Sequence, residues 1–228
     1  MLDHRPIGIT LTRLVLGLAA AVVCTAGARV HATESPSSIF PRITYTKVLK
    51  GSFPEYLSIT VDQRGAAIYE GRKLDDPPSP RQLQLTDATT RRIFEIAAAL
   101  NNFDSGDLES YKKVANLGRK TLIYDDGTQK YQVEFNYTQR HEARELVDIL
   151  ERISTVAQYI ATLEYSIQFD HLSLPTQLRQ IQTDLDRRAL ADPELMAPTL
   201  EKIVRNPRFL HLAQSRAQNI LERLQERH

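Results

Sequence analysis

Cysteine, histidine and acidic side chains are the usual parts of catalytic and metal sites, and their positions in this sequence favour no such site. Cys24 is the single cysteine and lies in an apolar run near the start of the chain. After the predicted signal-peptide cleavage at Ala32, the histidines that remain are His141, His171, His211 and His228. None has a second histidine or cysteine three or four residues away, the spacing that places two zinc ligands on one face of a helix. We therefore predict no catalytic residue set, no metal site and no cofactor.

Acidic residues in one polar stretch raise an alternative. Asp104, Asp107 and Glu109 stand close together in the segment from Asp104 to Lys120. A pair of carboxylates can supply the general acid and the general base of a hydrolase, although acids in a surface loop are more often simply hydrated. The sequence has neither the glycine spacing of a phosphate-binding loop nor a G-x-S-x-G nucleophile motif. A carboxylate-dependent hydrolase using the loop from Asp104 to Glu109 is thus the alternative to a non-enzymatic function.

The start of the chain indicates export. Arg5 and Arg13 precede the apolar run at 14–28, and Val30 and Ala32 are small enough for a signal-peptidase site. Cleavage after Ala32 predicts a signal peptide at 1–32 and a flexible leader at 33–41. Cleavage after 28, or retention of the run as an anchor, is the alternative, but the run is shorter than the roughly 20 apolar residues that span a bilayer. We expect a periplasmic or secreted protein.

Composition limits the partners of the exported chain. Removal of 1–32 takes away three of the 29 basic and one of the 28 acidic residues, which leaves 26 and 27. A net charge near zero gives no reason to expect nucleic acid or an anionic membrane as partner. Without Cys24 no disulfide can form, so the apolar core must hold the fold together. We expect an unknown extracytoplasmic protein or envelope component as partner, and no stable membrane span after cleavage.

Residues 42–138 are predicted to form a β-rich α+β domain. Apolar and polar residues alternate at 56–62, the pattern of a half-buried strand, and Gly65 supplies a turn to a partner strand at 66–73. Further strands are expected at 43–49 and 81–86, and a second hairpin pairs 121–125 with 130–138 across Asp126-Gly127. Asp87 is expected to cap a helix at 88–101 between these hairpins.

The remaining residues are predicted to be helical. The stretch 141–169 has no glycine or proline and repeats apolar residues at spacings of three and four, which is typical of a long amphipathic helix. We expect this connecting helix, at 139–170, to cover the sheet with its first half and to pack on the C-terminal helices with its second half. A homodimer through the long helix is the alternative. Asp192-Pro193 and Asn206-Pro207 are expected to begin two of the helices at 171–228.

Several short segments occur in a recurring order. They are TKVLKG at 46–51, PEY at 54–56 and YEG at 69–71, followed by the helix and the second hairpin. With KVANLG at 113–118 and NPRFL at 206–210, the chain resembles uncharacterised exported bacterial proteins that carry a domain of unknown function. The resemblance implies an exported compartment and a fold type, and it brings no activity and no site residue.

These patterns together predict an α+β fold. A small antiparallel β-sheet with a packed helix, at 42–138, is joined by the long helix at 139–170 to an all-α C-terminal part at 171–228. Two well-patterned parts and no catalytic motif favour a non-enzymatic extracytoplasmic binding or interaction module.

Overall fold

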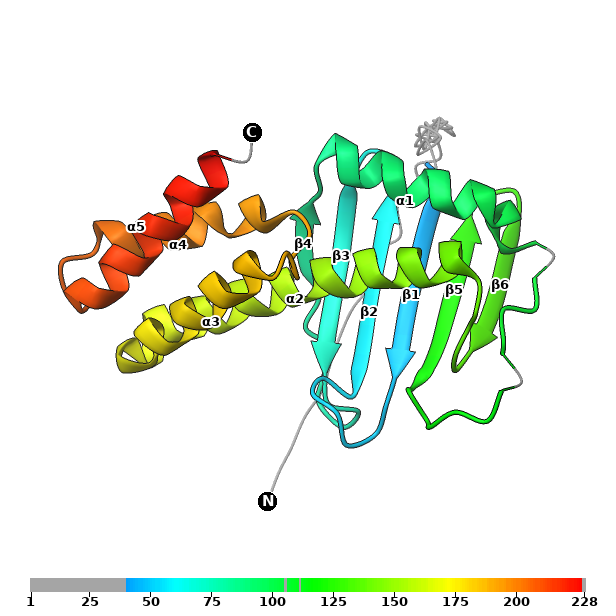
Figure 1. Cartoon of the computed structure of the whole chain (residues 1–228), viewed down its shortest axis with the longest axis horizontal. Helices are drawn as coiled ribbons and strands as arrows, with labels where there is room; N and C mark the ends of the chain where they lie inside the picture. Colours follow the sequence, from blue (N-terminus) through cyan, green and yellow to red (C-terminus); the bar gives the residue numbers. More distant parts are fainter. Residues whose placement is uncertain (1–39, 105, 111, 227–228) are drawn as a thin grey trace, which may run out of the picture. The chain divides into compact units, whose positions relative to one another are not determined.

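A sheet followed by helices makes up the part of the chain that the structure describes. The computed structural model describes residues 40–104, 106–110 and 112–226. The predicted signal peptide at 1–32 lies outside these residues, as do positions 33–39 of the predicted leader and His228. Six antiparallel strands and five α-helices form the described part, with helices alone from α2 onward (Figure 1). The predicted α+β fold is confirmed.

The strands arise where apolar and polar residues alternate. They are β1 (Arg42–Val48), β2 (Tyr56–Asp62), β3 (Ala66–Arg72), β4 (Arg81–Gln84), β5 (Arg119–Asp125) and β6 (Lys130–Phe135), in the spatial order β4-β3-β2-β1-β5-β6. The bounds of β2 are those that its alternation predicts. Gly65 and Gly127 turn the two hairpins with φ angles of +79° and +85°, the left-handed region that favours glycine.

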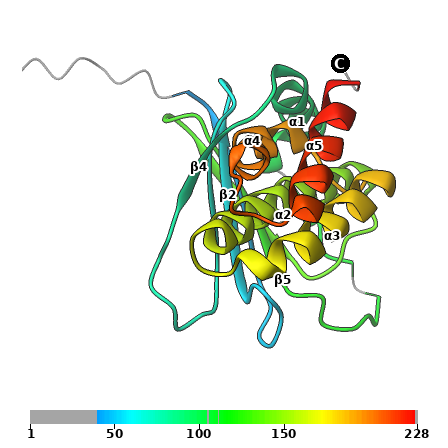
Figure 2. The same cartoon turned by 90° about the vertical axis from the view of Figure 1, so that its left-hand side faces the viewer.

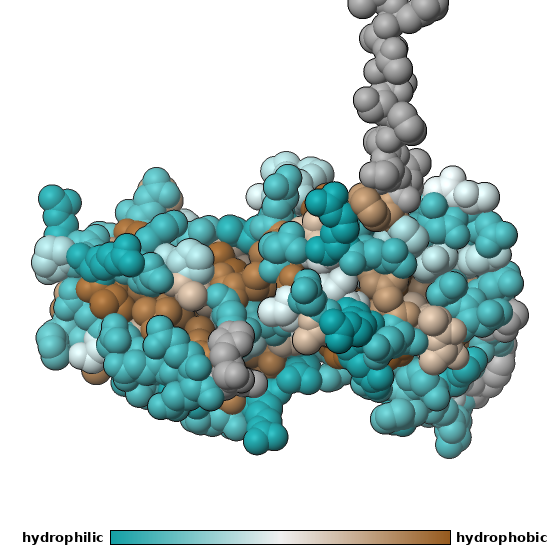
Figure 3. Space-filling view, turned by 90° about the horizontal axis from the view of Figure 1, so that it is seen from above, coloured by the Kyte–Doolittle hydropathy of each residue, from teal (hydrophilic) through white to brown (hydrophobic). Residues whose placement is uncertain are grey.

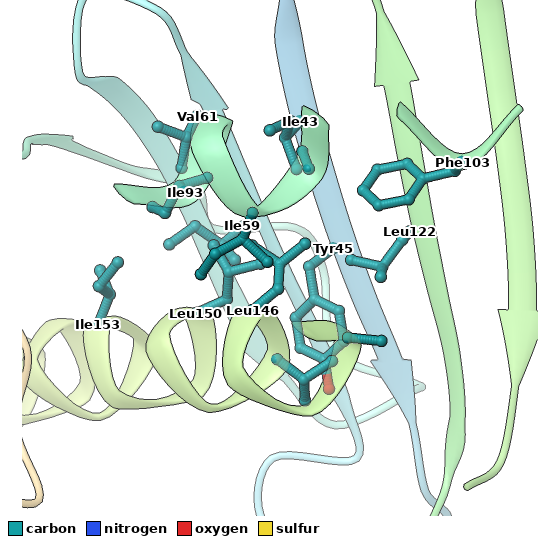
Figure 4. Packing of buried hydrophobic residues seen from close by; sticks show 14 of the residues in the cluster. Ile43, Tyr45, Ile59, Val61, Ile93, Phe103, Leu122, Leu146, Leu150 and Ile153 are labelled. Carbon is teal, nitrogen blue, oxygen red and sulfur yellow. The ribbon is translucent and has the colours of Figure 1, made fainter. Parts of the chain in front are cut away.

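One face of the sheet is covered by two helices, α1 (Asp87–Ala99) and α2 (His141–Phe169), which lie on the same side of the strands (Figures 1 and 2). Tyr45, Ile59 and Leu122 extend from the strands into the layer where Leu146 and Leu150 of α2 lie, and all five are fully buried (Figure 4). The covering layer therefore contains the helix predicted within residues 42–138 and the first half of the long helix, as the sequence predicts.

Helix α2 is shared between two apolar clusters, as predicted. Residues of its first half, including Leu146 and Ile153, belong to the cluster formed with the sheet and α1. Val156, Ile160 and Leu163 belong to a second cluster formed with the C-terminal helices. The change occurs within one helical turn, because Ile153 and Val156 are three residues apart. Both clusters consist of buried apolar side chains, and Ile153, Val156 and Leu163 have no exposed area.

Three α-helices follow α2, and the signals that were expected to start two of them act differently. The 3-10 helix η2 (His171–Ser173) leads into α3 (Leu174–Asp186), and η3 (Pro193–Met196) leads into α4 (Ala197–Arg205). Asp192 precedes η3 with a left-handed φ of +49°, and its side chain makes no capping bond there. Helix α5 (His211–Gln225) begins four residues after Pro207, because Asn206 Oδ1 accepts from the N–H of Arg208 at 3.0 Å and closes a turn instead.

The start and the end of α1 also differ from expectation. Thr86, not Asp87, is the capping residue, and its Oγ1 accepts from the N–H of Thr89 at 3.3 Å. Asp87 lies in the first turn, where a negative charge faces the positive end of the helix dipole. The helix ends at Ala99, before the predicted end at 101, because all residues of the following η1 (Asn101–Phe103) have positive φ angles of 49° to 69°.

Large apolar residues are exposed at the end of the molecule that the C-terminal helices form. Seen from above, apolar surface gathers over the helical half and polar surface over most of the sheet half (Figure 3). Phe169 and Leu172 are 65% and 78% exposed. The ring of His171 lies 4.8 Å from that of Phe209, so the turn after α2 and the turn before α5 are neighbours.

Candidate functional site

A hollow of about 510 Å³ lies where α2 leaves the sheet. It is lined by the β1–β2 loop at Phe53 and Pro54, by Tyr69 and Gly71 of β3, by residues 79–82 at the start of β4, and by Gln158, Ala161 and Thr162 of α2. We call it the junction groove. Its volume falls within the range of about 300–1,000 Å³ that is typical of small-molecule sites.

Phe53 stands at this groove with its ring 84% exposed. Its loop is nevertheless held at several points. The N–H of Leu49 donates to Glu55 O at 2.8 Å, Ser52 Oγ donates to Leu49 O at 2.7 Å, and the N–H of Glu55 donates to Arg72 O at 3.1 Å. The loop backbone is therefore held in place, and the Phe53 side chain projects from it into solvent.

The side chain of Glu55 completes the support of this loop. Its Oε1 accepts from the N–H of Gly51 at 2.8 Å, and its Oε2 accepts from the N–H of Leu74 at 3.2 Å. These two backbone donors lower the pKa of Glu55 below its ordinary value, because they stabilise the ionised carboxylate. One ionised carboxylate thus ties the Phe53 loop to the chain that leaves β3.

Tyr69 forms the inner wall of the groove. The side chain is buried, which raises the pKa of its phenol to about 12, while a hydrogen bond from Gln158 works in the opposite direction. A Cβ atom added at Gly71 would lie 2.0 Å from Tyr69 Oη. The tyrosine hydroxyl therefore fills the space above Gly71 and needs glycine there.

The remaining polar groups give the groove little net charge. The guanidinium of Arg81 pairs with Glu164 of α2, with Nη1 and Oε2 2.8 Å apart and both side chains about one-third exposed. Gln158 adds an amide, and the Thr162 hydroxyl donates to Gln158 O at 2.9 Å. The groove thus combines an aromatic ring with amide, hydroxyl and neutralised guanidinium groups.

The structure brings together two of the three acids that the sequence singles out. Asp107 and Glu109 line a hollow of about 390 Å³ beside Thr138, and Asp104 is not part of its lining. Asp107 Oδ1 accepts from the N–H of Glu109 at 3.0 Å, and Glu109 Oε2 accepts from the N–H of Asn136 at 2.6 Å. Both carboxylates therefore shape the backbone around them.

The described histidines lie apart from one another. His141 is mostly exposed, His171 Nε2 lies 2.7 Å from Ile167 O, and His211 Nδ1 lies 3.4 Å from Ser215 Oγ. Within residues 40–104, 106–110 and 112–226, no three histidine, cysteine or acidic residues cluster as a metal site would require.

Lys120 is a polar feature that the sequence patterns miss. This lysine is 9% exposed, and its Nζ donates to the carbonyl oxygens of Leu117, Gly118 and Asn136 at 2.9–3.4 Å. Burial, and then the positive charge of Lys47, lowers its pKa. Because three carbonyl groups already take its three protons, the ammonium group serves as a clamp between β5 and the loops around it.

The junction groove could not be read from motifs, since its residues extend from Phe53 to Thr162. The sequence offers one hint, an aromatic residue in the short turn Gly51-Ser52-Phe53-Pro54, where a buried role is not expected. Both partners of the Arg81–Glu164 pair are ordinary surface residue types.

Comparisons with known proteins add no family to this geometry. A scan against models of protein families and a search of curated proteins found no match to the chain. In the described part of the chain, no helix has the length and apolar character that a membrane crossing needs.

Proposed function

We propose that this chain is exported and acts outside the cytoplasm as a non-enzymatic binding module, with the junction groove as its ligand site. The observation that carries the proposal is the Phe53 ring, which is 84% exposed and yet held by a hydrogen-bonded loop. An exposed aromatic residue on an ordered backbone segment can bury a large apolar area without a cost for ordering the loop, which is the property of an interface anchor.

The chemistry of the groove supports binding rather than turnover. A general acid or base works best when its pKa is near the working pH. Tyr69 has a pKa of about 12 and stays protonated, and Arg81 is paired with Glu164. These groups can donate and accept hydrogen bonds, but none is suited to exchange a proton with a substrate near neutral pH.

The carboxylate-dependent hydrolase is the second hypothesis, and the geometry gives it little support. Asp107 and Glu109 face one hollow, but each accepts a hydrogen bond from a backbone N–H. The hypothesis requires Asp104, Asp107 and Glu109 in one pocket, and Asp104 is exposed outside that hollow.

The partner of the module is proposed to be an extracytoplasmic protein or envelope component. A homodimer through the long helix would have to use its exposed end, where the rings of Tyr165 and Phe169 lie 5.1 Å apart, because most of the apolar stripe of α2 is buried within the chain. Sedimentation of wild type and Tyr165→Ala would separate these arrangements, since a dimer of this kind would dissociate in the variant.

Photocrosslinking tests the groove as the ligand site. A photoreactive amino acid would replace Ser79, which is exposed and lines the groove, and in a matched control would replace Arg91, which is exposed on α1. Irradiation of cells that export the chain is expected to give a defined adduct from position 79 and none from position 91. Absence of an adduct at 79, or the same adduct at both positions, contradicts the proposal.

The location is tested at the N-terminus. The chain recovered from the exporting cell is expected to begin at Thr33, or at Arg29 if cleavage occurs earlier. Sequencing that finds Met1 retained in membranes would establish an anchor instead.

A further inference from the structure

The hydrogen-bonding groups of the junction groove act as donors and acceptors at once. Gln158 carries an amide, with an oxygen that accepts and an NH₂ group that donates. The hydroxyl groups of Tyr69 and Thr162, which also line the groove, can each accept a hydrogen bond as well as donate one. The matching ligand has many groups that also donate and accept, and hydroxyl groups are the simplest groups of that kind.

The charge of the groove favours a neutral ligand. Arg81 is the charged residue of the lining, and Glu164 holds its guanidinium at 2.8 Å. An anionic ligand would have to compete with this carboxylate, and a cationic one would meet the guanidinium. A neutral ligand can instead share hydrogen bonds with both partners of the pair.

The Phe53 ring provides the apolar part of the site. With 84% of its area exposed, the ring offers an open face to a ligand. Sugar rings have a face of C–H groups above and below a rim of hydroxyl groups, so they can stack on an aromatic ring while their rim bonds to polar side chains. The groove places such a ring near the amide of Gln158.

A proline-rich peptide fits these observations less well. Such a peptide offers carbonyl acceptors and few N–H donors, so the oxygens of Gln158 and Glu164 would lose water without gaining a partner. Peptide grooves of this type also use several aromatic rings. Here Phe53 is the exposed ring, and Tyr69 is only 5% exposed.

We propose that the junction groove binds a neutral saccharide, with one sugar ring stacked on Phe53 and its hydroxyl groups bonded to the amide of Gln158. This inference rests on the proposed function of the groove and names the class of its ligand.

Titration calorimetry of the full chain tests the saccharide class. The probes are chitohexaose, cellohexaose and maltohexaose, raised into the millimolar range, with decaproline as the competing class. At least one saccharide is expected to bind. Phe53→Ala is expected to weaken that binding tenfold or more, and Gln158→Ala severalfold. Phe169→Ala, which removes a ring that is 65% exposed at the far end of α2, is the matched control and should bind as the wild type does.

Each outcome bears on a different part of the proposal. Binding of no saccharide, or equal affinity of wild type and Phe53→Ala, overturns the saccharide class. Decaproline binding that is lost in Phe53→Ala, without saccharide binding, also overturns it but leaves the groove as the ligand site. Since Phe53 is exposed, Phe53→Ala should not change the midpoint of thermal unfolding, and this measurement identifies a misfolded sample of either variant.

Discussion

Asp192 joins the helical end of the chain to the sheet part through one buried carboxylate. The residue is 6% exposed, and its two oxygens accept from the N–H and the hydroxyl of Thr86 at 2.7 and 2.9 Å. The hydroxyl of Thr89 donates to the same carboxylate. Asp192 therefore supports the start of α1, more than 100 residues away in sequence, where a negative charge also meets the positive end of the helix dipole.

Replacing Asp192 by alanine should destabilise the whole described unit. Asp192→Ala removes the acceptor of a backbone N–H and two hydroxyl groups, and hydrogen bonds to a charged group contribute about 1.5–3 kcal/mol. We expect a loss of about 3 kcal/mol in the free energy of unfolding, measured in urea. Asp192→Asn keeps one oxygen acceptor and should lose less. A loss below about 0.5 kcal/mol in Asp192→Ala, the range of ordinary surface substitutions, would show that the contact is not a stabilising one.

The loop between β1 and β2 shows how one element prepares the groove. Glu55 binds the N–H groups of Gly51 and Leu74, which holds the segment that carries Phe53. These bonds lower the pKa of Glu55, so the ionised carboxylate belongs to the ordered loop. Since the folded-state pKa is depressed, the contribution is present above the ordinary glutamate pKa and is lost as the pH falls through the lowered value.

Acidification should therefore loosen the Phe53 loop before it unfolds the sheet. The protection of the Gly51 and Leu74 amides against exchange, relative to the intrinsic rate at each pH, should fall as the pH drops below the ordinary range of glutamate, while protection in β2 stays high. Glu55→Gln should show the faster exchange already at neutral pH. Glu95→Gln, which changes an exposed glutamate on α1, is the control. Equal exchange rates in Glu55→Gln and wild type at neutral pH would show that the Glu55 carboxylate does not stabilise this loop.

At the scale of elements, periodic patterns were reliable and single capping residues were not. The alternation at 56–62 and the spacing at 141–169 predict the bounds of β2 and α2 as the structure has them. Such patterns repeat over many residues, so one exception does not change them. Asp192 and Asn206 have the composition of local helix starts, but a contact with α1 and a turn at Arg208 use their side chains instead.

Sequence patterns could not predict the junction groove, and the reason is topological. Strand β3 lies next to β4 at one end of the sheet, and α2 crosses the sheet toward this end before it continues among the C-terminal helices (Figure 1). This crossing brings Gln158 to Tyr69. Neither residue belongs to a motif, and only the pairing of β3 and the path of α2 make them neighbours.

The two apolar clusters meet so closely that we expect the described part to unfold as one unit. On one turn of α2, Val156 belongs to the helical cluster and Ala157 to the sheet cluster. Leu83 of β4 and Leu195 of η3 pack against both clusters. A sheet that lost its order would therefore remove part of the surface on which the C-terminal helices pack, and loss of these helices would expose the second half of α2.

A charge at this border should reveal the coupling. Ile153 has no exposed area, so Ile153→Asp places an unpaired carboxylate among apolar side chains and should cost about 4 kcal/mol. Amide exchange should then accelerate together at Tyr45 in β1 and at Ile220 in α5, because both depend on the same global unfolding. Gln168→Asp, at an exposed position of α2, should change the free energy of unfolding by no more than about 0.5 kcal/mol. Fast exchange at Tyr45 with unchanged protection at Ile220 would mean that the helices after α2 fold independently of the sheet.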